Sequence, residues 1–111
     1  ISKFKKKKIE LIRSKLYKSR YLDLKPIIKK LYNLGFRNTL VEGGDLLTTN
    51  FLKSKIFNEF YLFKSKKKLP TNSDFVKFNG LKVLKNKYVL IKNLNSFYGK
   101  DTIKLYTKKY V

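Results

Sequence analysis

The sequence predicts an α/β fold in which helices flank a mostly parallel sheet and antiparallel strands complete the C-terminal side. From residue 9 to residue 63, strand-like and helix-like segments follow the order β-α-β-α-β, and strands joined by helices become parallel through right-handed crossovers. After Pro70, apolar and polar residues alternate between short turn signals. The 111 residues are 42% hydrophobic, which suffices for one small domain with a packed core.

The first predicted strand and helix lie upstream of Gly35. A basic run at residues 5–8 leads into the apolar segment 9–12, which is typical of a strand entered from a loop. Asp23 is a favourable N-cap, Pro26 fits the first helical turn, and Gly35 suits the position just beyond the helix end. Between these signals the apolar residues follow the helical period: Leu24, Ile27, Ile28, Leu31 and Leu34.

A second strand and helix follow. Phe36 and residues 39–41 give a short apolar run without polar alternation, which favours a strand buried in a parallel sheet. The apolar residues of segment 46–52 mark a helix that ends near Lys53 to Lys55, where lysines would offset the negative end of the helix dipole.

The remaining predicted strands lie in the C-terminal half. Residues 60–63 predict a strand bounded by lysines and Pro70. Beyond Pro70, period-two alternation predicts four antiparallel strands, at residues 75–78, 81–84, 88–91 and 102–106. Turn signals separate these strands: Asn79-Gly80, Asn86-Lys87 and Tyr98-Gly99.

The composition excludes several classes of chemistry. The chain has no cysteine and no histidine, so it can form neither a disulfide, nor a Cys/His zinc site, nor a Ser-His-Asp or Cys-His nucleophilic pair. We expect no metal site. The basic N-terminal stretch lacks the apolar region of a signal peptide, and no apolar run approaches the ~20 residues that span a membrane. The expected location is the cytoplasm, with no membrane partner.

The formal net charge of +21 leaves two interpretations. The charge is almost all lysine, and residues with AT-rich codons (Lys, Asn, Ile, Phe and Tyr) are abundant, so an AT-biased genome would give this excess on solvated faces without selection for binding. Arginine, which makes bidentate contacts with nucleic acid, is scarce. We therefore favour solvated faces, also for residues 5–8 beside Phe4. The alternative is a small lysine-rich module that binds nucleic acid.

Aromatic residues surround the predicted strand 60–63. They could form a platform on which bases stack, but aromatic residues in a predicted sheet strand are more often part of the core. We therefore expect core positions for Phe57, Phe60, Tyr61 and Phe63.

The most informative segment is the glycine pair at residues 43 and 44. An apolar run ends on Glu42, passes through Gly43 and Gly44, and opens into the predicted helix. Glycines at a strand-to-helix turn let backbone N–H groups approach a phosphate, and the helix N-terminus adds partial positive charge. Alternatively, the glycines form only a tight turn that needs positive φ, which is compatible with a phosphate site because phosphate-binding loops are tight turns. This segment is a candidate nucleotide site.

Together these residues resemble a known family, the C-terminal reductase domain of the bifunctional riboflavin biosynthesis deaminase/reductase (pyrimidine reductase) family. The similar positions run from Asp23-Leu24 through the helix to Gly35, then through residues 40–44, Leu47, Leu52 and Glu59. The resemblance implies a dihydrofolate-reductase-like fold. It also implies NADPH-dependent reduction of 5-amino-6-(5-phosphoribosylamino)uracil to the ribitylamino product.

The resemblance also implies roles for individual residues. Glu42 matches the carboxylate that contacts the substrate. The segment that would hold the NADPH phosphates comprises Gly43, Gly44, Asp45, Leu46, Leu47 and Thr48. A carboxylate beside a phosphate is repulsive, so we expect Asp45 to cap the helix with its side chain turned away from the cofactor. No residue is assigned to the hydride-transfer step.

The sequence departs from the family pattern in three places and covers only part of it. Asn58 replaces an aspartate, Lys55 replaces a glycine at the helix end, and Lys64-Ser65 replaces Ala-Pro. The first half of the reductase domain and the zinc deaminase half have no counterpart in these residues. We therefore expect residues 1–111 to be the C-terminal part of a single reductase domain in a multifunctional enzyme, inactive on its own. The resemblance suggests a homodimer.

Overall fold

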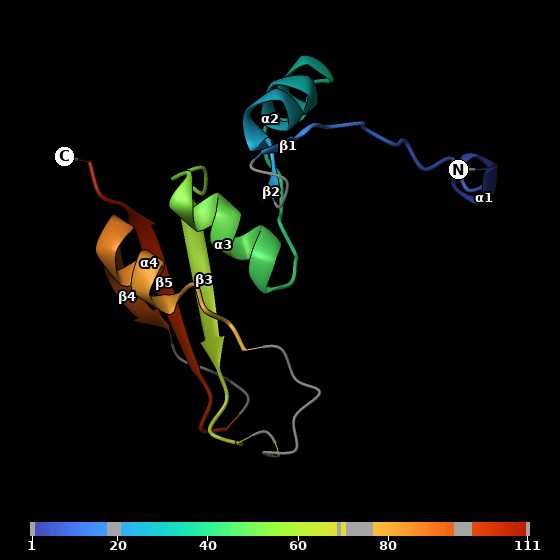
Figure 1. Ribbon diagram of the computed structural model, residues 1–111. Helices are drawn as coiled ribbons and strands as arrows, with labels where there is room; N and C mark the ends of the chain where they lie inside the picture. Colours follow the sequence, from blue (N-terminus) through green and yellow to red (C-terminus); the bar gives the residue numbers. More distant parts are fainter. Residues whose placement is uncertain (1, 18–20, 69, 71–76, 95–98, 111) are drawn as a thin grey trace. The chain divides into compact units, whose positions relative to one another are not determined.

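The computed structural model describes residues 2–17, 21–68, 70, 77–94 and 99–110 (Figure 1). The chain divides into two compact units, Ile1–Leu40 and Val41–Val111. Each unit contains helices and strands, and the second holds an antiparallel sheet, so the mixed α/β class and its C-terminal antiparallel strands are confirmed. The dihydrofolate-reductase-like arrangement remains a prediction.

The first unit contains two short helices and a small hairpin. Helix α1 spans Ser2–Lys6, strands β1 (Leu16–Tyr17) and β2 (Tyr21–Leu22) pair antiparallel, and helix α2 spans Leu24–Asn33. The strand predicted at residues 9–12 is wrong, because this segment pairs with no strand among the described residues. A strand exists only where a neighbour completes its backbone hydrogen bonds.

Helix α2 confirms the predicted helix and both of its boundaries. Asp23 occupies the N-cap with extended backbone, although its side chain makes no capping hydrogen bond. At the other end Gly35 adopts φ +94°, and its N–H donates to the Tyr32 carbonyl at 3.0 Å. The N–H of Phe36 donates to the Leu31 carbonyl at 3.1 Å. This pair of bonds is a Schellman motif, which requires a left-handed residue at the position of Gly35.

The second unit is built on a three-stranded sheet. It comprises α3 (Asp45–Lys53), β3 (Glu59–Lys64), α4 (Leu81–Lys87), β4 (Tyr88–Leu94) and β5 (Thr102–Lys108). The strand order is β3-β5-β4, and both pairings are antiparallel. The predictions of a helix over 46–52 and of strands at 60–63, 88–91 and 102–106 are confirmed.

The parallel part of the predicted sheet is wrong for the described residues. Residues 36–41 form no strand, and Phe36 and Leu40 are exposed, Leu40 by 84%. The continuous apolar run that predicted a buried strand here therefore buries little of its surface. Strand β3 instead pairs with β5, with Phe60 opposite Tyr106.

The segment predicted as a strand at residues 81–84 is instead the first turn of α4. Leu81, Leu84 and Tyr88 are spaced at i, i+3 and i+7, which also fits a helix, and the helix buries Leu84 completely. Asn86 and Lys87, predicted as a turn, are the last residues of this helix.

Two further predicted features fall partly on residues outside the described ranges. Of the strand predicted at 75–78, residues 75 and 76 lie outside them, and Lys77 and Phe78 form no strand. Tyr98 of the predicted Tyr98-Gly99 turn also lies outside, whereas Gly99 adopts φ +74° in a turn.

Gly80 is required by packing. A Cβ at this residue would lie 2.5 Å from the Phe78 ring and 3.0 Å from Leu52 Cδ1. The predicted Asn79-Gly80 signal therefore marks the place where the chain passes close to α3 before α4 begins.

The core of the second unit lies between the sheet and the two helices that cover one of its faces (Figure 1). Leu52 of α3, Leu84 of α4, Tyr88 of β4 and Tyr106 of β5 are its buried residues. Partly buried side chains surround them: Phe57, Phe60, Leu62, Phe78 and Val83. Every element of this unit thus contributes to one hydrophobic cluster.

The aromatic residues around β3 divide between core and surface. Phe57 stacks on the buried Phe51 at a centroid distance of 4.9 Å and lies 5.4 Å from Phe60, so the prediction of core positions is confirmed for Phe57 and Phe60. It is wrong for Tyr61 and Phe63, which are 46% and 71% exposed. Successive strand residues point to opposite faces, so only one member of each neighbouring pair can reach the core.

Helix α3 ends in the same motif as α2 but without a glycine. The N–H of Lys55 donates to the Leu52 carbonyl and the N–H of Ile56 donates to the Phe51 carbonyl, both at 3.2 Å. Lys55 adopts φ +53°. A left-handed backbone is costly for a residue with a Cβ, so this helix end is strained.

Among the residues described, no helix is long and apolar enough to cross a membrane.

Candidate functional site

The candidate site is the loop of Glu42, Gly43 and Gly44 together with the first turn of α3. Glu42 is exposed, and Gly44 is the N-cap of the helix with φ −71° and ψ 179°. Neither glycine has a positive φ, so the alternative interpretation as a positive-φ turn is wrong. An extended backbone is usual for an N-cap residue, because the chain enters the helix there from an extended segment. The first N–H groups of the helix then face the loop without an intrahelical partner.

The two glycines differ in what surrounds them. A Cβ on Gly43 would lie 2.9 Å from Leu47 Cδ2, so the absence of a side chain there lets Leu47 pack against the loop. A Cβ on Gly44 would meet no atom of the described residues within 4 Å. The open side of Gly44 lies at the positive end of the α3 dipole, where an anion can approach the backbone closely.

Asp45 holds the first turn of α3 to a distant part of the chain. It is the first residue of the helix and does not cap it, so the predicted capping role is wrong. Its carboxylate accepts hydrogen bonds from the Asn79 backbone N–H at 2.6 Å, from Asn79 Nδ2 at 3.0 Å and from Thr49 Oγ1 at 3.2 Å. These three donors occupy the carboxylate, which lessens its conflict with an anion at Gly44.

Thr48 and the two leucines complete the turn. The Thr48 hydroxyl donates to the Gly43 carbonyl at 3.3 Å, and the Thr48 N–H donates to the Gly44 carbonyl at 3.1 Å. Leu47 is half-buried, whereas Leu46 is 48% exposed. The six residues predicted to hold a cofactor therefore lie together, as contiguous residues at a helix start must.

Sequence reasoning missed two residues that support this helix. Asn79 lies 34 residues beyond Asp45, so no local pattern links them. At the opposite end of α3, the Lys87 ammonium of α4 donates to the Lys53 carbonyl. Lys53 lies in the last helical turn, as predicted, but it is the cation of Lys87 that binds a terminal carbonyl.

The geometry of the α3 N-terminus fits a phosphate group. No side chain caps the helix, the Cβ direction of Gly44 is open, and the one carboxylate of the first turn is bound to Asn79 and Thr49. A phosphate here would accept hydrogen bonds from backbone N–H groups of the first turn. Within the described part of the chain, no group of three or more acidic side chains is placed to hold a metal ion.

No protein-family model, curated protein or solved structure matches this chain.

Proposed function

We propose that this chain is part of an NADPH-dependent reductase that acts on 5-amino-6-(5-phosphoribosylamino)uracil in riboflavin biosynthesis. The observation that carries the proposal is the junction of Glu42, Gly43 and Gly44 with α3, where an exposed carboxylate stands beside an uncapped helix N-terminus with an open glycine. The resemblance of this segment, and of its spacing to Glu59, to the pyrimidine reductase family supports the same assignment.

The residues of the junction would divide the binding between two ligands. The backbone N–H groups of the first turn of α3 would hold a cofactor phosphate, with Gly44 allowing close approach. Glu42 would accept a hydrogen bond from the substrate. NADPH supplies the hydride when bound, and the protein supplies orientation and electrostatic complementarity. The chemistry requires no histidine or cysteine, in agreement with the composition.

NADPH binding to the 111-residue chain tests the cofactor site. Equilibrium titration by NADPH fluorescence should give saturable binding that is weaker for NADH. Gly44→Val should weaken NADPH binding about tenfold, because its branched side chain fills the open side of the loop, whereas Gly44→Ala should weaken it less. Ser54→Val, at the other end of the same helix, is the control and should leave the affinity unchanged.

Substrate binding tests the role of Glu42. Calorimetric titration with the phosphoribosylaminouracil should show weaker binding to Glu42→Gln than to the unmodified chain, with NADPH affinity unchanged. The proposed site would be overturned if both Gly44 variants bound NADPH as tightly as the unmodified chain. It would also be overturned if Glu42→Gln lowered the affinities for NADPH and for the substrate equally.

A further inference from the structure

The face of the sheet opposite α3 and α4 is apolar and exposed. We call this surface the outer face. Strand alternation and the register place nine side chains on it: Glu59, Tyr61, Phe63, Val89, Lys92, Leu94, Ile103, Leu105 and Thr107. Phe63 is 71% exposed, Tyr61 46% and Val89 41%, and Ile103 and Leu105 are half-buried. Two large aromatic rings are thus displayed where solvent reaches them.

The two aromatic rings lie on one strand, each beside an aliphatic neighbour. Tyr61 is opposite Leu105 and Phe63 is opposite Ile103 in the register of β3 and β5. The Tyr61 hydroxyl donates to Glu59 Oε2 at 3.1 Å, which restrains the ring, and this carboxylate raises the pKa of Tyr61. The rings are two residues apart on a rigid strand, a spacing of about 7 Å that suits successive unstacked bases.

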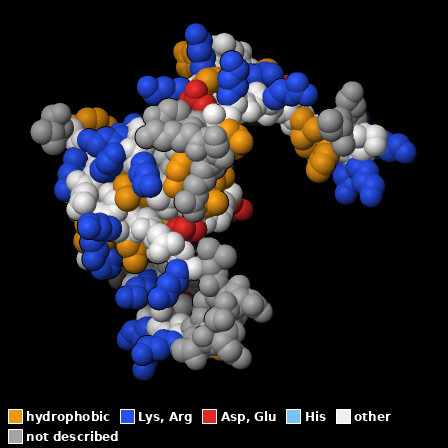
Figure 2. All heavy atoms as spheres, viewed as in Figure 1, with side chains coloured by type: hydrophobic (Ala, Val, Ile, Leu, Met, Phe, Trp, Pro, Cys, Tyr) orange, Lys and Arg blue, Asp and Glu red, His pale blue; other side chains and the backbone are white. Residues whose placement is uncertain are grey.

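Lysines surround the end of the sheet nearest Phe63. The loop after β3 and the loop before β5 meet there, and the Lys66 backbone N–H donates to Asp101 Oδ1 at 3.3 Å. The exposed lysines of these loops are Lys66, Lys67, Lys68 and Lys100. Figure 2 shows blue side chains gathered at this end, where β3 ends and β5 begins. Lys92 adds a charge on the outer face itself, opposite Leu105.

The charge selects the kind of partner. Two copies of a chain with a formal net charge of +21 repel each other, which argues against a second copy on this face. A neutral apolar segment would cover the rings but would leave the lysine loops unused. A single-stranded nucleic acid uses both features, because its bases stack on aromatic rings and its phosphates bind lysines.

We propose that the outer face binds single-stranded nucleic acid, with bases stacked on Phe63 and Tyr61 and phosphates held by the lysine loops after β3 and before β5. This surface is separate from the N-terminus of α3, since α3 covers the other face of the sheet (Figure 1). The proposal therefore stands independently of the reductase assignment. Glu59, at the far end of β3 from the lysine loops, opposes the phosphates, so the site ends at Tyr61, whose hydroxyl donates to Glu59.

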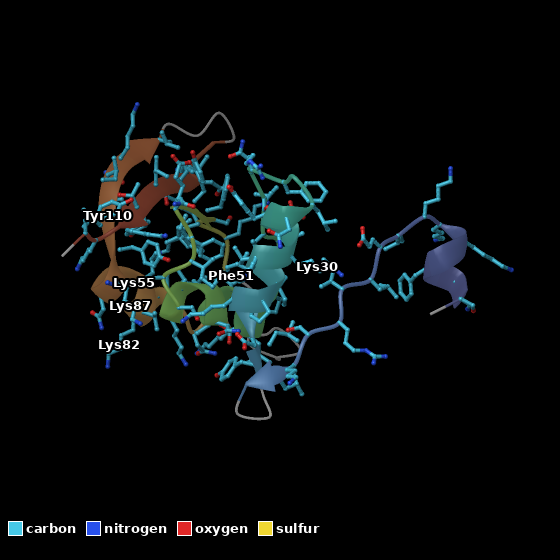
Figure 3. The ribbon with its side chains drawn as sticks, turned by 90° about the horizontal axis from the view of Figure 1, so that it is seen from above. Lys30, Phe51, Lys55, Lys82, Lys87 and Tyr110 are labelled. Atoms are coloured by element: carbon cyan, nitrogen blue, oxygen red, sulfur yellow. The ribbon has the colours of Figure 1, made fainter. Side chains whose placement is uncertain are left out.

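Binding of a fluorescent oligothymidylate of about 12 nucleotides to the 111-residue chain tests the proposal, with anisotropy as the readout. Phe63→Leu keeps an apolar side chain but removes the aromatic face, and it should weaken binding about tenfold; Phe63→Trp should preserve binding. Tyr110→Leu is the matched control, because Tyr110 is 88% exposed but lies beyond the end of β5 (Figure 3). Unchanged circular dichroism would show that each variant folds.

The salt dependence of binding tests the lysines. For single strands, each phosphate contact contributes about 0.7 to the slope of log affinity against log salt, so Lys66→Ala and Lys100→Ala should each lower the slope by about that amount. Lys82→Ala is the control for charge, because Lys82 is exposed on α4, on the other side of the sheet (Figure 3).

Three results would overturn the proposal. The first is no binding at about 0.1 M salt. The Debye length there is about 10 Å, so direct contacts between lysines and phosphates should still contribute. The second is equal affinity for single-stranded and duplex oligonucleotides, or equal affinity of the original chain and Phe63→Leu, since either leaves no role for stacking. The third is a dimer in sedimentation equilibrium that Phe63→Leu dissociates, which would assign the outer face to a second copy.

Discussion

The two faces of the β3-β5-β4 sheet come from the same strands but meet different surroundings. On the inner face, Tyr88 and Tyr106 are 1% and 6% exposed beneath α3 and α4. On the outer face, Phe63 is 71% exposed. Aromatic composition does not distinguish these residues, whereas their position in the alternation of a strand does. Burial on one face holds the unit together, and exposure on the other leaves rings available to a ligand.

This difference predicts that substitutions on the two faces separate stability from binding. Inner-face substitutions should lower the free energy of unfolding of the Val41–Val111 unit. Outer-face substitutions should change affinity with little effect on stability, because exposed side chains lose little burial when they are altered.

The largest expected effect is on the inner face. Leu84 is completely buried between Leu52 and the sheet tyrosines, so Leu84→Ala should lower the free energy of unfolding by about 2–5 kcal/mol. Leu81→Ala, in the same helix but 42% exposed, is the control. Urea denaturation measures both values, and equal losses would mean that the inner face is not the core.

The hydrogen bonds that join α3 to the segment before α4 should make the next largest contribution to the free energy of unfolding. Asp45→Ala removes the acceptor of two bonds from Asn79 and one from Thr49, and should cost about 1–3 kcal/mol. A double-mutant cycle with Asn79→Ala should show coupling, since the two side chains bond directly. Additive effects would show that the bond contributes nothing to stability.

A smaller effect, of opposite sign, is expected at the end of α3. Lys55 adopts φ +53° where Gly35 ends α2 with φ +94°, so Lys55→Gly should raise the free energy of unfolding by about 1 kcal/mol. Lys53→Gly, inside the helix, should lower it by roughly 0.5–1 kcal/mol. A lower free energy of unfolding in Lys55→Gly would contradict the inference that the left-handed backbone of Lys55 is strained.

The smallest effect concerns the Tyr88 hydroxyl. It is buried and has no hydrogen-bond partner among the residues that the structure describes. Burial raises the pKa of Tyr88 above its ordinary value of 10.0. The nearby backbone of Phe57 lowers this pKa and offsets only part of the rise. The unfolded chain therefore loses this proton first as the pH rises above about 10, and stability falls there. Tyr88→Phe should be neutral or stabilising by up to about 1 kcal/mol at pH 7 and should reduce the alkaline loss.

That alkaline loss is measured by urea denaturation at pH values on either side of 10.0, with Tyr88→Phe beside the original chain. An identical alkaline loss in both proteins would assign the titration to other groups.

Local signals in the sequence were sufficient for the helices whose ends they mark. Asp23, Pro26 and Gly35 define α2, and the glycine pair defines the start of α3, because caps and helix ends depend on neighbouring residues. Residues 42–48 lie together at the start of α3 because they are contiguous, and their role in binding a cofactor stays a prediction.

Features that depend on distant partners could not be predicted from local patterns. Residues 9–12 and 36–41 have strand-like composition, but within the part of the chain that the structure describes they pair with no strand. The bond from Asn79 to Asp45 joins positions 34 residues apart. Leu81 and Val83 fit a two-residue period, whereas Leu81 and Leu84 fit a helical period, and only the packing of Leu84 in one cluster with Leu52 favours the helix.

The most direct test is an NMR titration of the 111-residue chain with NADPH, observing backbone amide shifts. Binding at the N-terminus of α3 should shift the amides of Gly44, Asp45 and Leu46 most, and should leave those of Tyr61 and Phe63 on the outer face unchanged. Gly44→Val should abolish these shifts. Saturable shifts confined to the outer face, or no shifts at all, would contradict a cofactor site at the glycine pair.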